Sequence, residues 1–249
     1  MKLEIDLNAD LGEGAAGEEE LLGLISSASI ACGFHAGDPA TMSASIRAAR
    51  AAGVAVGAHP GFADRENFGR KELPVSPEEV FQLVAYQVGA FDGIARSLGL
   101  RPNHVKPHGA LYTIAVRDEA LADAIARAVF ALDPALKLFA PNDSALAAAA
   151  TRVGLRVLLE VFADRNYMPD GTLVHRSRPD ALLHDPVEAA ERVLRMLREN
   201  RVRAIDGSDV VVRAETICLH GDKPEAVAFA HQLRAALEAE GIAIAAPKV

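Results

Sequence analysis

Four of the eight histidines in this 249-residue sequence lie within two residues of a glycine, where an apolar run gives way to a turn. They are His35, His59, His108 and His220, in the stretches ACGFHAGDP, GAHPG, KPHGA and CLHGD. Histidine titrates near neutrality and can accept or donate a proton, and glycine lets a ligand approach the backbone closely. One such histidine is more often a core residue, but four in the same setting predict a shared active site.

Polar residues alternate with apolar ones in the first apolar stretch of the chain. If this stretch is a strand, Asp6, Asn8 and Asp10 share one face. A strand buried on both faces is normally apolar throughout, so this polar stripe must face partners, a ligand or water. We expect Asn8 and Asp10 in the site; a solvated edge strand is the alternative.

A second polar stripe is formed by His104, Lys106 and His108, which alternate with Val105 and Pro107. A lysine between imidazoles could hold an anion or stabilise an oxyanion. The alternative is a lysine that reaches solvent beside a core histidine.

A third stripe contains Glu160 and Asp164 and is followed by Arg165. Carboxylate and guanidinium groups together could bind an amino-acid-like substrate, which carries both charges. A structural ion pair is an equally good explanation of these residues.

Short apolar runs and helical patterns alternate along the chain. The apolar runs predict strands at 3–8, 28–34, 54–59, 103–108, 136–140, 155–162 and 210–220, with a further short strand at 241–245. Helices are predicted at 18–25, 39–52, 77–98, 118–131, 143–152, 186–200 and 223–240. Several of these helices start at a predicted N-cap, namely Asp38, Ser76, Asp185 and Asp222.

This alternation predicts parallel strands joined by helices, an α/β fold in a single domain over residues 1–249. Polar residues end nearly every strand. That favours a closed barrel, whose strand ends all meet at one mouth, over an open doubly wound sheet, whose site lies at a switch point. Two long loops, 61–76 and 163–185, are candidates for functional segments.

Common binding motifs are absent or poorly matched. The stretch 12–17 fits G-x-G-x-x-G, but Asp10, Glu13 and the glutamates at 18–20 would repel a pyrophosphate. No P-loop, G-x-S-x-G or H-E-x-x-H motif occurs. A metal site would therefore have to assemble from several strands, and we assign no metal ligand.

The composition is that of an ordinary globular protein, 50% hydrophobic and 24% charged. A formal net charge of −8 and a pI near 5.5 argue against nucleic acid or an anionic membrane as a partner. Carboxylates occupy the N-terminus where a signal peptide needs an apolar segment, so we expect a cytoplasmic protein. Cys32 and Cys218 are expected to be buried thiols rather than a disulfide.

Six motifs, in order, closely resemble the LamB/YcsF family, whose members are subunits of the bacterial 5-oxoprolinase: DLNADLGE, ACGFHAGDP, GAHPGFAD, VKPHGALY, FADRNY and CLHGD. The resemblance implies a seven-stranded β/α barrel of the glycoside hydrolase/deacetylase type. It also implies ATP-dependent opening of 5-oxo-L-proline to L-glutamate. This reaction would need two other 5-oxoprolinase subunits, which would handle most of the ATP.

For this reaction we hypothesise five catalytic residues. Asp10, His35 or His59 would deprotonate the attacking water. Lys106 and His108 would neutralise a phosphate placed on the lactam oxygen and protonate the departing nitrogen.

A second group would bind the substrate. Asn8, Glu160 and Arg165 would orient its carboxylate and ring N–H, and Asp164 and His220 are assigned to the same task. Two alternatives stay open, a metal-dependent amidohydrolase or deacetylase and a non-catalytic binding or regulatory subunit. A homo-oligomer is also compatible with the sequence.

Overall fold

Seven parallel strands close into a barrel in the computed structural model, which describes residues 3–220 and 226–248. The order around the barrel is β1-β2-β3-β4-β5-β6-β9, and β9 pairs with β1 to complete the ring. The strands are β1 (Glu4–Leu11), β2 (Ser27–Ala31), β3 (Ala55–His59), β4 (His104–Val105), β5 (Lys137–Pro141), β6 (Arg156–Phe162) and β9 (Thr216–Leu219). The predicted β/α barrel is confirmed, and the open sheet is excluded.

Within residues 3–220 and 226–248, three short strands lie outside this ring. β10 (Ala243–Ile244) pairs with the first residues of β1, whereas β7 (Arg201–Arg203) and β8 (Asp209–Val211) form an antiparallel pair. The single strand predicted at 210–220 is therefore wrong, because its two halves belong to different sheets. Both halves are apolar, and local periodicity does not show where a chain changes sheet.

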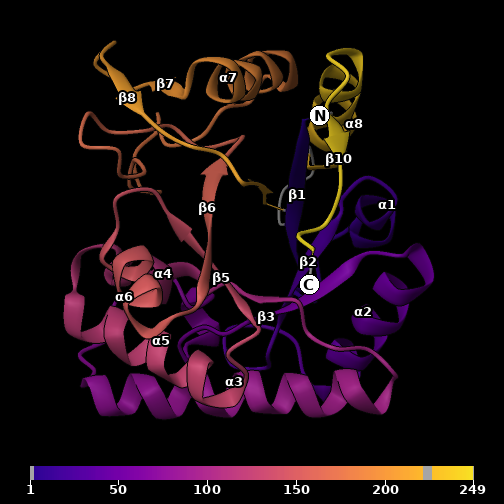
Figure 1. The fold of residues 1–249 in the computed structure, drawn as a ribbon, viewed down its shortest axis with the longest axis vertical. Coiled ribbons are helices and arrows are strands. Elements are labelled where there is room, and N and C mark those ends of the chain that lie inside the picture. Colours follow the sequence, from indigo (N-terminus) through magenta and orange to yellow (C-terminus); the bar gives the residue numbers. More distant parts are fainter. Residues whose placement is uncertain (1–2, 221–225, 249) are drawn as a thin grey trace.

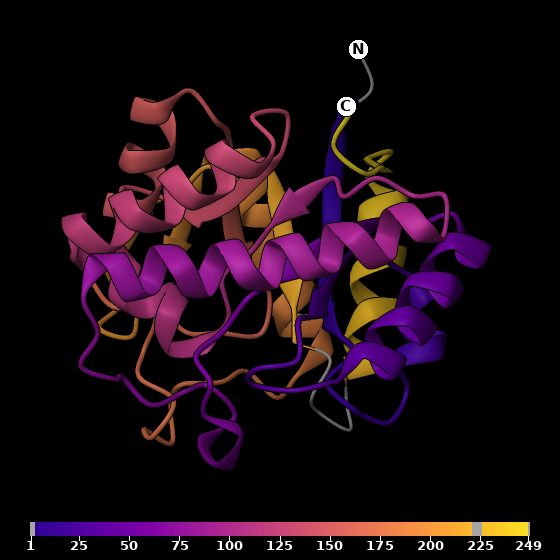
Figure 2. The same ribbon diagram turned by 90° about the horizontal axis from the view of Figure 1, so that it is seen from below.

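Helices surround the strands (Figure 1), and Figure 2 shows the longest of them, α3, lying across one side of the barrel. The helices are α1 (Glu18–Leu22), α2 (Pro39–Ala52), α3 (Pro77–Ser97), α4 (Gly109–Arg117), α5 (Glu119–Leu132), α6 (Ala145–Val153), α7 (Pro186–Glu199) and α8 (Ala226–Ala239), with a short 3-10 helix at Arg65–Asn67. α3 starts at the predicted capping box of Ser76 and Glu79, and Asp38 and Asp185 cap α2 and α7. The cap predicted at Asp222 lies outside the described residues.

Helix α4 is missing from the sequence prediction, which extended the fourth strand to residue 108. Only His104 and Val105 pair as a strand, since Pro107 has no N–H to donate to a neighbour. The chain then turns at Gly109, where φ is +54°, and α4 begins immediately. This early helix holds residue 108 at the mouth of the barrel.

The two faces of β1 differ as predicted. Its apolar residues belong to the core between barrel and helices, whereas Asp6, Asn8 and Asp10 are buried inside the ring. Asn8 Nδ2 donates to Glu160 Oε1 on the non-adjacent strand β6, at 3.1 Å. The solvated edge strand is therefore the wrong alternative, because the barrel has no edge here.

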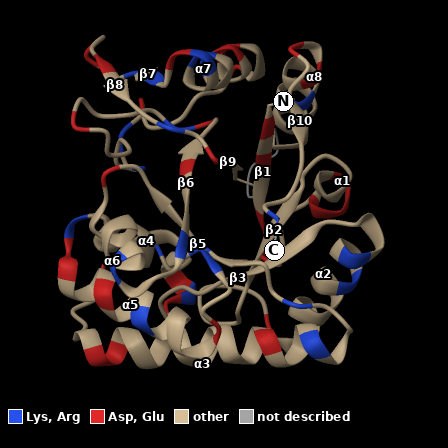
Figure 3. Cartoon of the chain, viewed as in Figure 1, with Lys and Arg blue, Asp and Glu red and all other residues tan. Residues whose placement is uncertain are grey.

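The outer surface carries charges of both signs, and Figure 3 shows them mixed along α3 and α5. In the part of the chain that the structure describes, no helix combines the length and the apolar character needed to cross a membrane. The polar chemistry is concentrated inside the barrel, at the carboxyl ends of its strands.

Candidate active site at the barrel mouth

Lys106 occupies the centre of the barrel mouth and is 2% exposed. Its Nζ lies 2.9 Å from Asp10 Oδ1, 3.0 Å from Glu160 Oε1, 3.0 Å from Asn8 Oδ1 and 2.9 Å from Cys218 Sγ. Burial by itself would lower the pKa of Lys106, but the charges of Asp10 and Glu160 and the hydrogen bond to Cys218 raise it well above the usual value. The side chain is therefore an ammonium that ties β1, β6 and β9 together.

Asp10 is the counter-ion between this ammonium and the histidines. Its Oδ2 lies 3.5 Å from His59 Nε2, on the side away from Lys106. Burial works to raise the pKa of Asp10, but His59 and Lys106 hold it well below the usual range. Asp10 is consequently a carboxylate throughout the neutral pH range.

Glu160 has donors on both carboxylate oxygens. Tyr112 Oη, from α4, donates to Oε2 at 2.6 Å, while Asn8 and Lys106 contact Oε1. Thr216 also bonds to the amide of Asn8, at 2.7 Å. These contacts fix the carboxylate that was predicted to bind substrate, and they position Lys106.

Three of the four predicted histidines form one cluster. His35, His59 and His108 come from the segments at the ends of β2, β3 and β4, and all are buried. His35 and His108 stack with ring centroids 3.8 Å apart, and His59 meets both rings edge-on. Burial lowers the pKa of His35 to about 2, and burial with the neighbouring imidazoles lowers that of His108 well below its usual value. Both of these rings are neutral at pH 7.

Glycines make this close packing of rings possible. A Cβ on Gly61 would lie 2.6 Å from His35 Nδ1, and one on Gly69 would lie 2.7 Å from His35 Cβ. Gly69 also has a φ of +62°, a backbone angle that residues other than glycine rarely adopt.

Glu13 is a member of the cluster that the sequence pattern did not reveal. Its Oε1 lies 3.1 Å from His35 Nε2, 3.3 Å from His108 Nδ1 and 3.7 Å from His59 Nε2. From the sequence, Glu13 was only a charge that would repel a phosphate. Its position directly after β1, three residues beyond Asp10, is the signal that could have placed it at the mouth.

The loop that carries Glu13 is held by a second glutamate. The Glu18 carboxylate accepts hydrogen bonds from the backbone N–H groups of Gly12, Glu13, Gly14 and Ala15, at 2.8–3.1 Å. These are the N–H groups that a bound phosphate would need. In the loop that matches G-x-G-x-x-G, these N–H groups are thus occupied by the protein's own carboxylate.

His220 lies apart from the other three histidines and pairs with Asp164. Its Nδ1 is 2.9 Å from Asp164 Oδ1, and its ring stacks on Phe162. Burial lowers the pKa of His220, and Asp164 opposes that effect. The two residues predicted to bind substrate therefore lie together at the end of β6 and β9.

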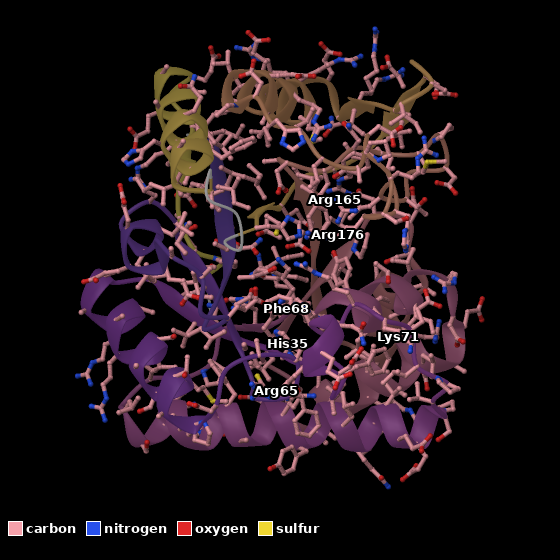
Figure 4. All side chains as sticks on the ribbon, turned by 180° about the vertical axis from the view of Figure 1, so that it is seen from behind. His35, Arg65, Phe68, Lys71, Arg165 and Arg176 are labelled. Carbon is pink, nitrogen blue, oxygen red and sulfur yellow. The ribbon has the colours of Figure 1, made fainter. Side chains whose placement is uncertain are left out.

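Arg165 belongs to the same mouth, but its guanidinium faces the long 163–185 loop. It donates to the backbone oxygens of Val174, at 2.6 Å, and Ala181, at 3.4 Å. Burial and the charge of nearby Arg176 lower the pKa of Arg165 to about 10. Figure 4 shows Arg165 next to Arg176, and His35 next to Phe68. Substrate binding by Arg165 stays a prediction.

Comparison with known proteins identifies a matching family. The model of the LamB/YcsF family matches residues 5–249. Among solved structures, a lactam utilization protein from Thermus thermophilus is 47% identical, with a TM-score of 0.92, and the match covers 98% of this chain and 100% of that chain.

Two deacetylases share the fold at much lower identity. The catalytic domain of a peptidoglycan N-acetylglucosamine deacetylase from Eubacterium rectale is 12% identical, with a TM-score of 0.53, over 100% of this chain and 89% of that one. A polysaccharide deacetylase from Bacillus cereus is 14% identical, with a TM-score of 0.51, over 100% and 93%. These likenesses support the barrel architecture.

Proposed function

The chain belongs to the LamB/YcsF family, and from this membership and the geometry of the barrel mouth we propose that it is the LamB/YcsF-type component of an ATP-dependent 5-oxoprolinase. In this proposal it opens 5-oxo-L-proline to L-glutamate, together with the two other subunits of that enzyme. The observation that carries the proposal is Lys106, a buried ammonium held between Asp10 and Glu160 beside a cluster of histidines. The 47% identity to a lactam utilization protein supports the choice of a lactam.

The chemistry requires activation of a stable bond. A five-membered lactam is an unstrained amide with a poor leaving group, so water needs help to attack it. Phosphorylation of the lactam oxygen by the partner subunits, at the expense of ATP, makes the ring carbon electrophilic. Water then adds to that carbon, the C–N bond breaks, phosphate leaves, and the nitrogen takes up a proton.

Asp10, His35 and His59 are the candidates for accepting the proton of the attacking water. Asp10 is ionised at neutral pH, and His59 Nε2 lies 3.5 Å from its carboxylate. A carboxylate at this distance stabilises the imidazolium that His59 becomes when it takes a proton. General base catalysis of this kind contributes about 10²–10⁴-fold to a rate.

Lys106 and His108 would act on the phosphate and on the departing nitrogen. An ammonium has three N–H bonds, yet four acceptors surround Lys106, and the sulfur of Cys218 is the weakest of them. A substrate oxygen in place of this sulfur would be a stronger acceptor for the ammonium. Asn8, Glu160, Asp164, Arg165 and His220 remain the proposed substrate-binding group.

Glutamate release from 5-oxo-L-proline and ATP tests the proposal. We would assay the pure chain, the two partner subunits, all three together, and the full mixture with His108→Ala or with His231→Ala. His231 lies on the exposed side of α8 and serves as the matched control. We expect activity only in the full mixture, lost with His108→Ala and kept with His231→Ala.

Other results would overturn the proposal. Activity of the partners without this chain would make its role regulatory. Absence of activity in every mixture would instead favour a hydrolase that acts on another amide.

A further inference from the structure

Four side chains at the mouth surround one point with electron-rich atoms. Glu13, His35, His59 and His108 each offer one oxygen or nitrogen, and these four atoms all lie within 4.8 Å of one another. The residues come from four different segments of the chain, so no single sequence motif contains them. Their hydrogen bonds decide what can lie between the four atoms.

The hydrogen bonds of two histidines fix their tautomers. His59 Nδ1 lies 2.7 Å from the backbone oxygen of Lys106, and His108 Nε2 lies 2.8 Å from that of Phe68. A carbonyl oxygen only accepts, so each of these nitrogens carries a hydrogen, and in the neutral form of the ring it carries the only one. The opposite nitrogens, His59 Nε2 and His108 Nδ1, then carry lone pairs.

These two lone pairs face one another at 2.9 Å. The carboxylate oxygen of Glu13 lies 3.3 Å from one of them and 3.7 Å from the other. Three acceptors at such distances repel each other unless a positive charge lies between them. A positive charge at this point, carried either by a metal ion or by a proton, offsets this repulsion.

His35 completes the set. Its Nε2 lies 3.1 Å from the same Glu13 oxygen, and its Nδ1 has no hydrogen-bond partner among the described residues. The ring can thus shift its proton to Nδ1 and turn a lone pair on Nε2 toward the cation. Stacking on His108 holds the ring in this orientation.

We propose that Glu13, His35, His59 and His108 bind one divalent transition-metal ion of the zinc class. Imidazole and carboxylate suit Zn²⁺, Co²⁺ and Fe²⁺. A tetrahedral ion with bonds of ~2.0–2.1 Å separates its ligand atoms by about 3.4 Å. Four of the six separations here run from 2.9 to 3.7 Å, and all six are within 4.8 Å. Metal-binding histidines typically donate their other N–H to a backbone carbonyl, as His59 and His108 do.

A second group at the mouth does not fit a metal. Asp10, Cys218 and His220 also lie close together, but the ammonium of Lys106 is 2.9 Å from both Asp10 and Cys218. The positive charge that this group needs is supplied by the protein itself. The metal site is thus confined to the Glu13 cluster, and its existence does not depend on lactam opening. A bound metal would take the lone pairs of the three histidines, so that Asp10 would remain as the base and Lys106 as the acid of the proposed reaction.

Cobalt binding to the untagged, chelator-treated full-length chain tests this site without substrate or ATP. We expect one Co²⁺ per chain, with the intense visible absorption of a tetrahedral N/O site, and one competing Zn²⁺ by calorimetry. His108→Ala and the nearly isosteric Glu13→Gln should weaken binding at least tenfold. His220→Ala, from the second group, should bind as the unaltered chain does.

Two results would contradict this metal site. Absence of Co²⁺ and Zn²⁺ binding by the folded chain would overturn the proposal and assign the positive charge to a proton shared by the rings. Binding lost with His220→Ala but kept with Glu13→Gln would place the metal in the second group. Far-ultraviolet circular dichroism shows that each variant is folded before it is titrated.

Discussion

Tyr112 Oη lies 2.6 Å from Glu160 Oε2, and both side chains are buried. The two residues come from helix α4 and strand β6. Burial and the charge of Glu160 raise the pKa of Tyr112 well above its usual value, so the hydroxyl remains a donor. This bond attaches α4 to the carboxylate that holds Lys106.

Tyr112→Phe should destabilise the folded chain, although the aromatic side chain keeps its size and position. The change removes the hydroxyl donor to a buried oxygen of Glu160, which should lower the free energy of unfolding by about 1–3 kcal/mol. Urea unfolding followed by circular dichroism measures the loss. Tyr86→Phe is the control, because the Tyr86 side chain is 64% exposed. Equal midpoints for the two variants would contradict the role of this hydrogen bond.

Replacing Lys106 by alanine should remove both activity and stability. Asp10 and Glu160 would be left as buried carboxylates without their cation, and breaking a buried ion pair costs ~3–5 kcal/mol. Loss of charge stabilisation at the reacting centre should reduce glutamate release by about 10²–10³-fold. The assay is run at a temperature at which the variant is folded.

Lys137→Ala is the matched control for Lys106→Ala. Lys137 is equally buried but lies at the start of β5, at the opposite end of the barrel. It should lose stability with little loss of activity. If Lys106→Ala reduced activity less than about threefold, its proposed catalytic role would be wrong.

The two thiols should be unreactive in the folded chain. Cys32 and Cys218 are free and buried, and burial raises the pKa of Cys32 to about 12 and that of Cys218 well above 9.0. The thiolate is the reactive form, so a disulfide reagent should label neither thiol natively and both in denaturant. Rapid labelling of a native thiol would show that the mouth opens to admit the reagent.

The same shift gives stability a pH dependence with a definite sign. In the unfolded chain Cys32 ionises near 9.0, and in the folded chain near 12, so unfolding releases a proton between these values. The contribution of Cys32 is complete below pH 9.0 and is lost as pH rises toward 12. Between pH 9.0 and 12, the free energy of unfolding should fall less steeply with pH for Cys32→Ala than for the unaltered chain.

Two glycine-to-alanine changes should have opposite effects. A Cβ on Gly57 would lie 2.3 Å from the His104 ring, which is fixed by stacking on Phe139 and by a 3.0 Å bond to Ser29. Overpacking of this kind costs about 1–3 kcal/mol. Gly89 lies within α3 with no atom within 4 Å of the added Cβ, so alanine there should stabilise by about 0.5–1 kcal/mol. Thermal unfolding measures both changes.

Local sequence pattern was enough to predict the barrel and much of its mouth. The polar stripe of β1 is visible as a two-residue period, and the glycines beside His35, His59 and His108 mark strand ends. In a parallel barrel all carboxyl ends meet at one mouth. Convergence of the three histidines therefore followed from the fold class without any knowledge of distances.

Tertiary structure alone decided how these residues are paired. Glu13 joins the histidines because β1 and β4 place their loops over the same mouth, and Lys106 contacts Cys218 across 112 residues of chain. Arg165 turns toward carbonyls of its own loop, which no strand pattern specifies. A periodic pattern tells which face a side chain is on. Which atom lies opposite depends on the register and closure of strands far apart in the sequence, and only the folded barrel sets these.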